Sequence, residues 1–104
     1  MHRVLFVMHR KEGMSAEAFV AHYRDSHIPI TRRLSGLRQY DVFPVLDDNG
    51  PDAFAIMVFD SAEDFEAALA SEEFKEATAD SAEFVGGAES YTIDHIPAVG
   101  GVEA

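Results

Sequence analysis

Short runs of this chain at residues 3–9, 37–46, 53–59 and 89–96 have the composition of β-strands. They are rich in β-branched and aromatic side chains, as is typical of strands. The runs at 3–9 and 53–59 are apolar at successive positions rather than at alternate ones. This pattern predicts that both faces of these strands are covered, as in the centre of a sheet.

An amphipathic helix is predicted between the first two strands. Ser15 is a suitable N-cap, and apolar side chains recur at Phe19 and Tyr23 with the spacing of one helical face. Pro29 disfavours the helical conformation of the residue before it, so we expect the helix to end at His27. A short basic turn up to Gly36 then leads into the second strand.

Helical segments are also predicted between the last two strands. Ser61 opens a sequence that resembles a capping box, and Ser71 is a suitable cap for a further segment. Residues 84–87 include two glycines and are expected to break this helix. The last strand is expected to end at Pro97.

The resulting order is βαββαβ, which predicts an α+β, ferredoxin-like fold with helices on one face of a four-stranded antiparallel sheet. We expect a single domain over residues 1–104, with a core at 3–97 and a flexible tail at 98–104. Because helices cover one face only, the other face needs a partner. A homodimer packed sheet to sheet is the prediction, with positions such as Val4 and Phe6 facing the second copy.

Composition narrows the functions to consider. The formal net charge of −11 argues against nucleic acid or an anionic membrane as a partner, since both require a basic surface. The chain has no cysteine, which removes disulfides, thiolate nucleophiles and cysteine zinc sites. No apolar stretch approaches the ~18 residues of a membrane span, and no signal-peptide pattern is present, so a cytoplasmic location is expected.

Charge is distributed unevenly between the two halves of the sequence. Residues 60–89 hold ten acidic side chains and one lysine, whereas residues 1–40 hold seven arginines or lysines and three acids. An anionic or carbonyl-bearing ligand would be attracted to the basic half, which includes Arg38. The alternative is that these arginines form surface or intersubunit ion pairs.

His27 is the main candidate for chemistry. It lies on the same helical stripe as Phe19 and Tyr23, so a titratable imidazole is expected beside apolar surface. The alternative is a core histidine with a purely structural hydrogen bond. His22 is expected at the rim or in solvent, and Asp25 could orient an imidazole only if the helix end unwinds.

No metal site is expected. His22 and His27 are five residues apart, and this spacing does not bring two imidazoles onto one helical face. The chain also lacks the strand-to-helix glycine motifs that bind flavin, nicotinamide or phosphate, so no cofactor is predicted.

Several stretches resemble the EthD family of dimeric α/β-barrel proteins. The pattern F-x-x-H-Y-R-x-x-H-x-P runs from Phe19 to Pro29, and Gly36-Leu37-Arg38-Gln39-Tyr40 opens the second strand in a similar way. Residues 59–65 and 69–71 are similar to the family's second helical region. The resemblance covers residues 3–97 and implies a ferredoxin-like subunit that dimerises into a barrel.

The resemblance also implies a type of chemistry. EthD proteins accompany ether and aromatic degradation, and the wider superfamily includes a methylmuconolactone isomerase and polyketide decarboxylases or dehydratases, which move protons next to carbonyl groups. The resemblance implies that His27 acts as a general base and that Tyr40 donates a hydrogen bond to a developing oxyanion. Tyr23 stands where the family often has tryptophan.

A ligand cavity is therefore predicted beside the first helix, mainly apolar and sized for a small molecule. The residues expected to line it, besides His27 and Tyr40, are Phe6, Met8, Phe19, Tyr23, Ile30, Arg38 and Phe59.

The predicted function is a cofactor-free isomerase, lyase or decarboxylase acting on a small oxygenated aromatic, lactone or polyketide-like compound. One alternative is a non-catalytic accessory that binds an apolar ligand. Another, by superfamily analogy, is a cofactor-independent or haem-linked oxygenase.

Overall fold

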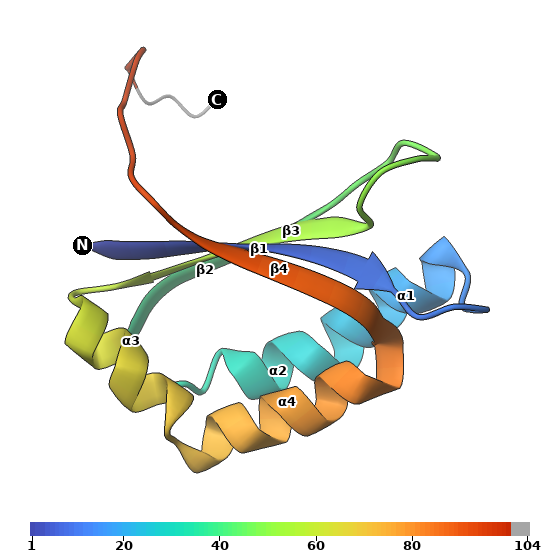
Figure 1. Cartoon of the computed structure of the whole chain (residues 1–104), viewed down its shortest axis with the longest axis horizontal. Helices are drawn as coiled ribbons and strands as arrows, with labels where there is room; N and C mark the ends of the chain where they lie inside the picture. The colour runs from blue at the N-terminus through green and yellow to red at the C-terminus, as the bar shows by residue number, and fades with distance from the viewer. Residues whose placement is uncertain (101–104) are drawn as a thin grey trace.

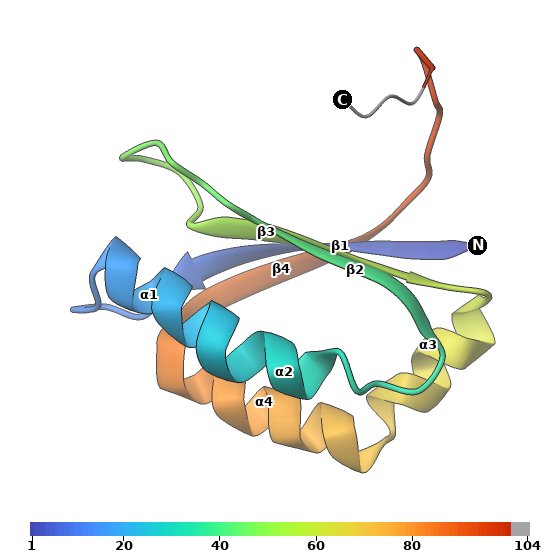
Figure 2. The ribbon, with the colours of Figure 1, turned by 180° about the vertical axis from the view of Figure 1, so that it is seen from behind.

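The computed structural model describes residues 1–100 and consists of one sheet with helices on one of its faces (Figure 1). Figure 2 shows the same arrangement from behind, with α1, α2 and α4 all on one side of the strands. The elements in chain order are β1 (His2–Arg10), α1 (Ala16–His22), the π-helical segment η1 (Tyr23–His27), α2 (Ile28–Thr31), β2 (Leu37–Pro44), β3 (Ala53–Phe59), α3 (Ala62–Leu69), α4 (Glu72–Phe84) and β4 (Val85–Ile93).

The sheet is four-stranded, has the order β2-β3-β1-β4 and is antiparallel throughout. The prediction of an α+β, ferredoxin-like fold is therefore confirmed. β1 and β3 are the two central strands, as their continuous apolar composition indicated.

The three predicted helix caps are also present. The hydroxyl oxygen of Ser15 accepts from the backbone N–H of Ala18 at 3.1 Å, and that of Ser61 accepts from Asp64 at 3.1 Å. Ser71 accepts from Phe74 at 3.2 Å. Each hydroxyl satisfies an N–H that the first helical turn leaves without a partner, so these serines fix where α1, α3 and α4 begin.

The prediction that Pro29 ends the first helix is wrong. Ile28 has helical dihedral angles (φ −60°, ψ −45°), and its N–H bonds to the carbonyl of Tyr23, five residues back. Helix thus continues from α1 through η1 into α2. The wider π turn comes just before Pro29. It leaves room for the pyrrolidine ring of Pro29, which would collide with the preceding turn of a regular α-helix.

β4 begins at Val85 and ends at Ile93, so the predicted range of 89–96 was displaced along the chain. The shift follows from Gly86, where a Cβ atom would lie 2.8 Å from the carbonyl oxygen of Arg10. The glycine lets β4 approach β1 directly after α4, beside an irregularity in the β1–β4 register at Arg10. Residues 94–100 have no regular structure, and the rest of the predicted tail, 101–104, lies outside the described residues.

Helices cover one face of the sheet and leave the other face open. Val4 is buried and Phe6 lines a cavity on the helix side, so the prediction that these two face a second copy is wrong. The alternate positions form the open face. Its apolar side chains include Leu5, Val7, Phe43, Phe54, Ile56 and Tyr91, of which Phe43 and Tyr91 are 49% and 56% exposed.

Candidate functional site

The candidate site lies between the sheet and two helical stretches that run beside each other, η1–α2 and α4 (Figure 2). Tyr23, His27 and Thr31 are spaced four residues apart along η1–α2, and all three are buried. Such spacing aligns side chains on one helical face, which here is the face directed at the sheet and α4.

His27 is paired with a carboxylate on the neighbouring helix. Its Nδ1 lies 2.9 Å from Oδ2 of Asp80, and its side chain is 8% exposed. An N–H at Nδ1 donates to the carboxylate, so the neutral ring carries its lone pair on Nε2. A base oriented in this way by a carboxylate is a recurring arrangement in acid–base catalysis.

Asp80 accepts three hydrogen bonds from η1 and the end of α1. Besides His27, Nε2 of His22 donates to Oδ1 at 3.0 Å and the hydroxyl of Ser26 donates to Oδ1 at 2.7 Å. Burial acts to raise the pKa of Asp80, but these hydrogen bonds outweigh it and hold the pKa below its usual range. Asp80 is therefore a carboxylate at neutral pH.

The pKa of His27 is lowered from its ordinary value of 6.5. Burial is the main cause, because it disfavours the charged ring, and the positive charge of a protonated His22 acts in the same direction. The hydrogen bond and charge of Asp80 oppose the shift without reversing it. His27 is consequently a neutral imidazole at pH 7 and able to accept a proton.

Two phenols lie near His27, of which that of Tyr23 is buried and that of Tyr40 is half-buried. Burial raises the pKa of Tyr40 to about 12, although the neighbouring hydroxyls of Thr31 and Tyr23 act to lower it. Burial raises the pKa of Tyr23 still further, and the Tyr40 phenol adds to the rise. Both groups stay protonated across the physiological range, so each can donate a hydrogen bond to a ligand oxygen.

Aromatic contacts hold the imidazole in place. The rings of Tyr23 and His27 meet edge to face with centroids 5.4 Å apart, and Phe84 lies 5.1 Å from His27 on the other helix. Phe84 also stacks on His22 at 4.5 Å. This packing restricts the rotation of both histidines and excludes water from their carboxylate partner.

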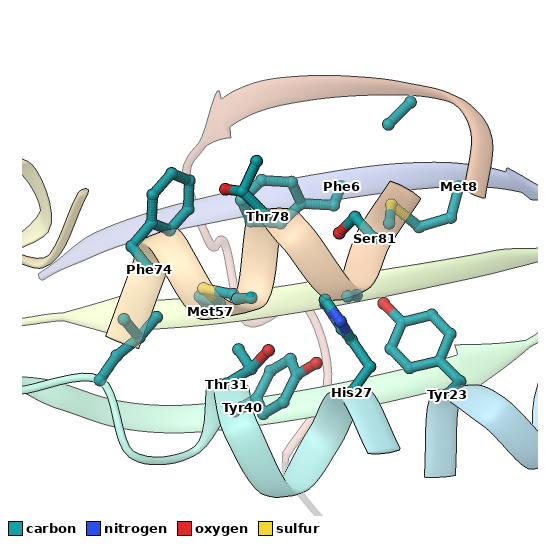
Figure 3. Close-up of a pocket in the computed structure, with 14 residues that line it drawn as sticks. Phe6, Met8, Tyr23, His27, Thr31, Tyr40, Met57, Phe74, Thr78 and Ser81 are labelled. Carbon is teal, nitrogen blue, oxygen red and sulfur yellow. The ribbon is translucent and has the colours of Figure 1, made fainter. Parts of the chain in front are cut away.

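Tyr23, His27 and Tyr40 border a cavity of about 180 Å³ (Figure 3). For comparison, a cavity of ~150 Å³ in another protein holds one benzene molecule. Thr78 and Ala88, on α4 and β4, are exposed members of the lining, so the cavity opens between these two elements. Its lining residues are Phe6, Met8, Tyr23, His27, Thr31, Leu34, Tyr40, Ala55, Met57, Phe74, Ala77, Thr78, Ser81 and Ala88.

The structure brings together five of the residues selected from the sequence, namely Phe6, Met8, Tyr23, His27 and Tyr40. The other four do not line the cavity. Phe19 and Phe59 are packed in the core, since they are 1% and 0% exposed. Arg38 is exposed and donates to Asp60, and Ile30 is half-buried elsewhere on α2.

Two expectations about polar neighbours are corrected. His22 is not a rim residue, because it is bound to Asp80 and stacked on Phe84. Asp25 is exposed and pairs with Arg24, so it does not orient an imidazole. The orienting group, Asp80, was missed. Its sequence signal is a carboxylate on the inner stripe of α4, between Ala77 and Phe84.

Among residues 1–100, no group of three or more histidine, aspartate, glutamate or cysteine side chains is arranged to hold a metal ion. Within the same residues, no helix has the length and apolar composition needed to span a bilayer.

A comparison with protein families identifies the chain. The EthD domain matches residues 11–88, which include η1, β2, β3 and α4. The chain belongs to the EthD family. A comparison with curated protein sequences gives no match.

Solved structures agree with this fold. An EthD family protein from Bacillus halodurans has a TM-score of 0.78 and 23% identity over 92% of this chain and 100% of its own. A dimeric ferredoxin-like protein of unknown function from Bacteroides fragilis has a TM-score of 0.72 and 10% identity, over 90% and 95%. A Nitrosomonas europaea protein described as a candidate antibiotic biosynthesis monooxygenase has a TM-score of 0.66 and 17% identity, over 92% and 99%.

Proposed function

We propose that this EthD protein is an enzyme that transfers a proton on a small, mainly apolar molecule bearing a carbonyl group. The observation that carries the proposal is the pair of His27 and Asp80, 2.9 Å apart, at the wall of an apolar cavity. A neutral imidazole whose Nδ1–H is fixed by a carboxylate is a general base with its lone pair on Nε2.

The proposed reaction is an isomerisation through an enol or enolate. Nε2 of His27 takes a proton from the carbon next to the carbonyl, the C–H electron pair forms a carbon–carbon double bond, and the carbonyl π pair moves onto oxygen. In a substrate that has a carbon–carbon double bond β,γ to the carbonyl, the enolate extends over both double bonds. His27 then returns the proton to the γ carbon, the oxygen electron pair re-forms the carbonyl, and the carbon–carbon double bond moves into conjugation with it. Atoms and electrons balance within one molecule, so proton transfer alone completes the reaction.

Each neighbouring group has a role in this scheme. Asp80 stabilises the imidazolium that forms when His27 is protonated, and Tyr40 donates a hydrogen bond to the developing oxyanion. Tyr23 lines the same cavity and is a further neutral donor. Because most of the lining is apolar, these interactions operate with little competition from water.

Cavity size and chemistry limit the substrate. A volume of about 180 Å³ suits a compound with one ring, and no lysine or arginine is among the lining residues. The substrate class is therefore a small, neutral oxygenated ring such as a cyclic ketone or lactone. This agrees with the proton-transfer chemistry that the family resemblance implies.

We also propose that the protein acts as a homodimer. The open face of the sheet carries Leu5, Phe54 and Ile56, which need a cover, and one of the similar structures is described as dimeric. A second copy of the same sheet would supply an apolar surface of matching shape.

The experiment is deuterium exchange in D₂O, followed by NMR, with a panel of cyclic ketones and lactones of one ring. Wild type is expected to exchange protons next to the carbonyl faster than buffer, and His27→Ala to lose roughly 10²- to 10⁴-fold of this rate. His9→Ala is the matched control, because His9 also pairs with a carboxylate, Glu89, but is exposed.

Two results would overturn the proposal. One is a folded His27→Ala protein that exchanges at the wild-type rate. The other is wild-type protein that binds members of the panel, seen as ligand line broadening, without accelerating exchange of any of them. This second result would identify a non-catalytic binding protein.

A further inference from the structure

We propose that Thr31 is a second polar anchor in the cavity, and that the physiological ligand carries a second neutral oxygen, a hydroxyl or a carbonyl, which binds there. This inference rests on the proposed function for the location of the site. It adds the substrate class: a one-ring carbonyl compound with an additional oxygen substituent.

The hydroxyl of Thr31 is the observation behind this proposal. The residue is 1% exposed, and its buried Oγ1 lies beside the Tyr40 phenol without forming a hydrogen bond of normal geometry with it or with another group among residues 1–100. Buried hydroxyls are almost always paired, because an unpaired one loses its bonds to water on folding and gains nothing in exchange. An unpaired hydroxyl at a cavity wall is therefore a group that a ligand can satisfy.

The local backbone does not provide the missing partner. A threonine within a helix commonly bonds to the carbonyl one turn earlier, but Oγ1 of Thr31 makes no such bond. Thr31 is the last residue of α2 and lines the cavity together with His27. The hydroxyl is thus available to the cavity rather than used to hold the helix.

The position of Thr31 defines where the second oxygen would lie. Thr31 follows His27 by four residues, which places the two one above the other on the same helical face, roughly 6 Å apart along the axis. A ligand of one ring can span this distance, with its reacting carbon near His27 and an oxygen substituent near Thr31. Figure 3 shows Thr31 and Tyr40 together at the same end of the cavity, with His27 between Tyr40 and Tyr23.

The surroundings favour a neutral oxygen over a carboxylate. Thr31 and Tyr40 offer hydroxyl groups that both donate and accept, and Tyr40 keeps its proton at neutral pH. Within the part of the chain that the structure describes, no lysine or arginine lines the cavity, so a buried carboxylate would lack a permanent countercharge. The Tyr23 phenol lies beside His27, and the other lining hydroxyls, on Thr78 and Ser81, lie toward the open side, where Thr78 is exposed and can bond to water.

The test compares two probes of nearly equal size, 3-hydroxycyclohexanone and 3-methylcyclohexanone. Their dissociation constants are measured by NMR titration or calorimetry on wild type, Thr31→Val and Thr31→Ser. Valine has the shape of threonine without its hydroxyl, and serine keeps the hydroxyl.

Wild type is expected to bind the hydroxyketone about five- to tenfold more tightly than the methylketone, which is the effect of one hydrogen bond. Thr31→Val should abolish this preference, and Thr31→Ser should retain most of it. The ligand-free Thr31→Val protein should melt at the same or a higher temperature than wild type, because an unpaired buried hydroxyl has been removed.

The proposal is overturned if Thr31→Val keeps the wild-type preference for the hydroxyketone. If this variant also melts several degrees lower than wild type, the Thr31 hydroxyl serves the fold instead. The proposed proton transfer and the proposed role of Thr31 can be disproved separately. If deuterium exchange is absent but the Thr31-dependent binding preference is present, the proposed enzyme activity is wrong and the proposed role of Thr31 stands. If exchange occurs without such a preference, only the proposed role of Thr31 is wrong.

Discussion

His22 and His27 share one carboxylate. Nε2 of His22 lies 3.0 Å from one oxygen of Asp80, and Nδ1 of His27 lies 2.9 Å from the other. The three groups therefore form one hydrogen-bonded unit, in which Asp80 raises and a positive charge on His22 lowers the pKa of His27. His22 has an exposed fraction of 26%, so this unit extends from the cavity toward solvent.

Asp80→Asn should lower the proposed proton transfer by about 10²-fold or more. The amide leaves His27 without a negative partner, so the imidazolium that forms in the reaction is less stable and the ring tautomer is no longer fixed. The measurement is the deuterium-exchange rate at saturating ligand. Asp25→Asn is the matched control, because Asp25 is an exposed carboxylate on η1 that pairs with Arg24. Equal rates in the two variants would remove Asp80 from the mechanism.

Stability should fall when the pH drops below about 6.5. The pKa of His27 is lower in the folded protein than its ordinary value of 6.5, so the unfolded chain binds more protons between the two values. The contribution of His27 is then complete above 6.5 and is lost as pH falls from 6.5 toward the folded-state pKa. Melting temperatures from pH 8 to 5 test this. In His27→Gln the decline between pH 7 and 5 should be smaller, and an identical decline would contradict the prediction.

The first three strands and the caps were predictable because their signals are local. β3 was predicted at its observed bounds, and Ser15, Ser61 and Ser71 cap the helices expected from them. Each of these features depends on residues within a few positions of one another, where side-chain period and turn chemistry dominate.

The site was predictable only in part, because its decisive contact joins distant segments. His27 and Asp80 are 53 residues apart, and no local pattern links them. The π turn was equally hidden, since the rule for residues before proline described a regular helix and not the looser turn that accepts Pro29. Thr31 has no sequence signal at all, because only the packed structure reveals that its hydroxyl is unpaired.

The open face of the sheet is expected to be the dimer interface. Ile56→Asp would place an unpaired charge in the centre of the apolar side chains on that face, and should convert the dimer into a monomer or an unstable chain. Leu69→Asp is the control, since Leu69 is an exposed apolar residue of α3 on the helix side. Light scattering gives the masses. A wild-type monomer at micromolar concentration would contradict the proposed dimer.

Gly86→Ala should destabilise the fold by about 1–3 kcal/mol, the usual range for inserting a methyl group into filled space. The added Cβ would lie 2.8 Å from the carbonyl oxygen of Arg10, a backbone atom that can move only if β1 moves. Gly87→Ala is the neighbouring control, because nothing lies within 4 Å of its Cβ position, and it should change stability by less than about 0.5 kcal/mol. Urea unfolding of both variants provides the comparison, and equal midpoints would mean that β1 adjusts freely.

His22→Gln should shift the pH dependence of the proposed proton transfer toward higher pH. The positive charge of a protonated His22 lowers the pKa of His27. Glutamine keeps a hydrogen-bond donor for Asp80 but cannot become charged, so the pKa of His27 should rise. Catalysis needs neutral His27, and the acid limb of the rate profile must then move up with that pKa. The measurement is the exchange rate from pH 4.5 to 8, together with NMR titration of the His27 ring protons. His9→Gln is the control and should leave the profile unchanged. A His22→Gln profile with lower rates throughout but the same acid limb would mean that His22 only supports the packing around Asp80.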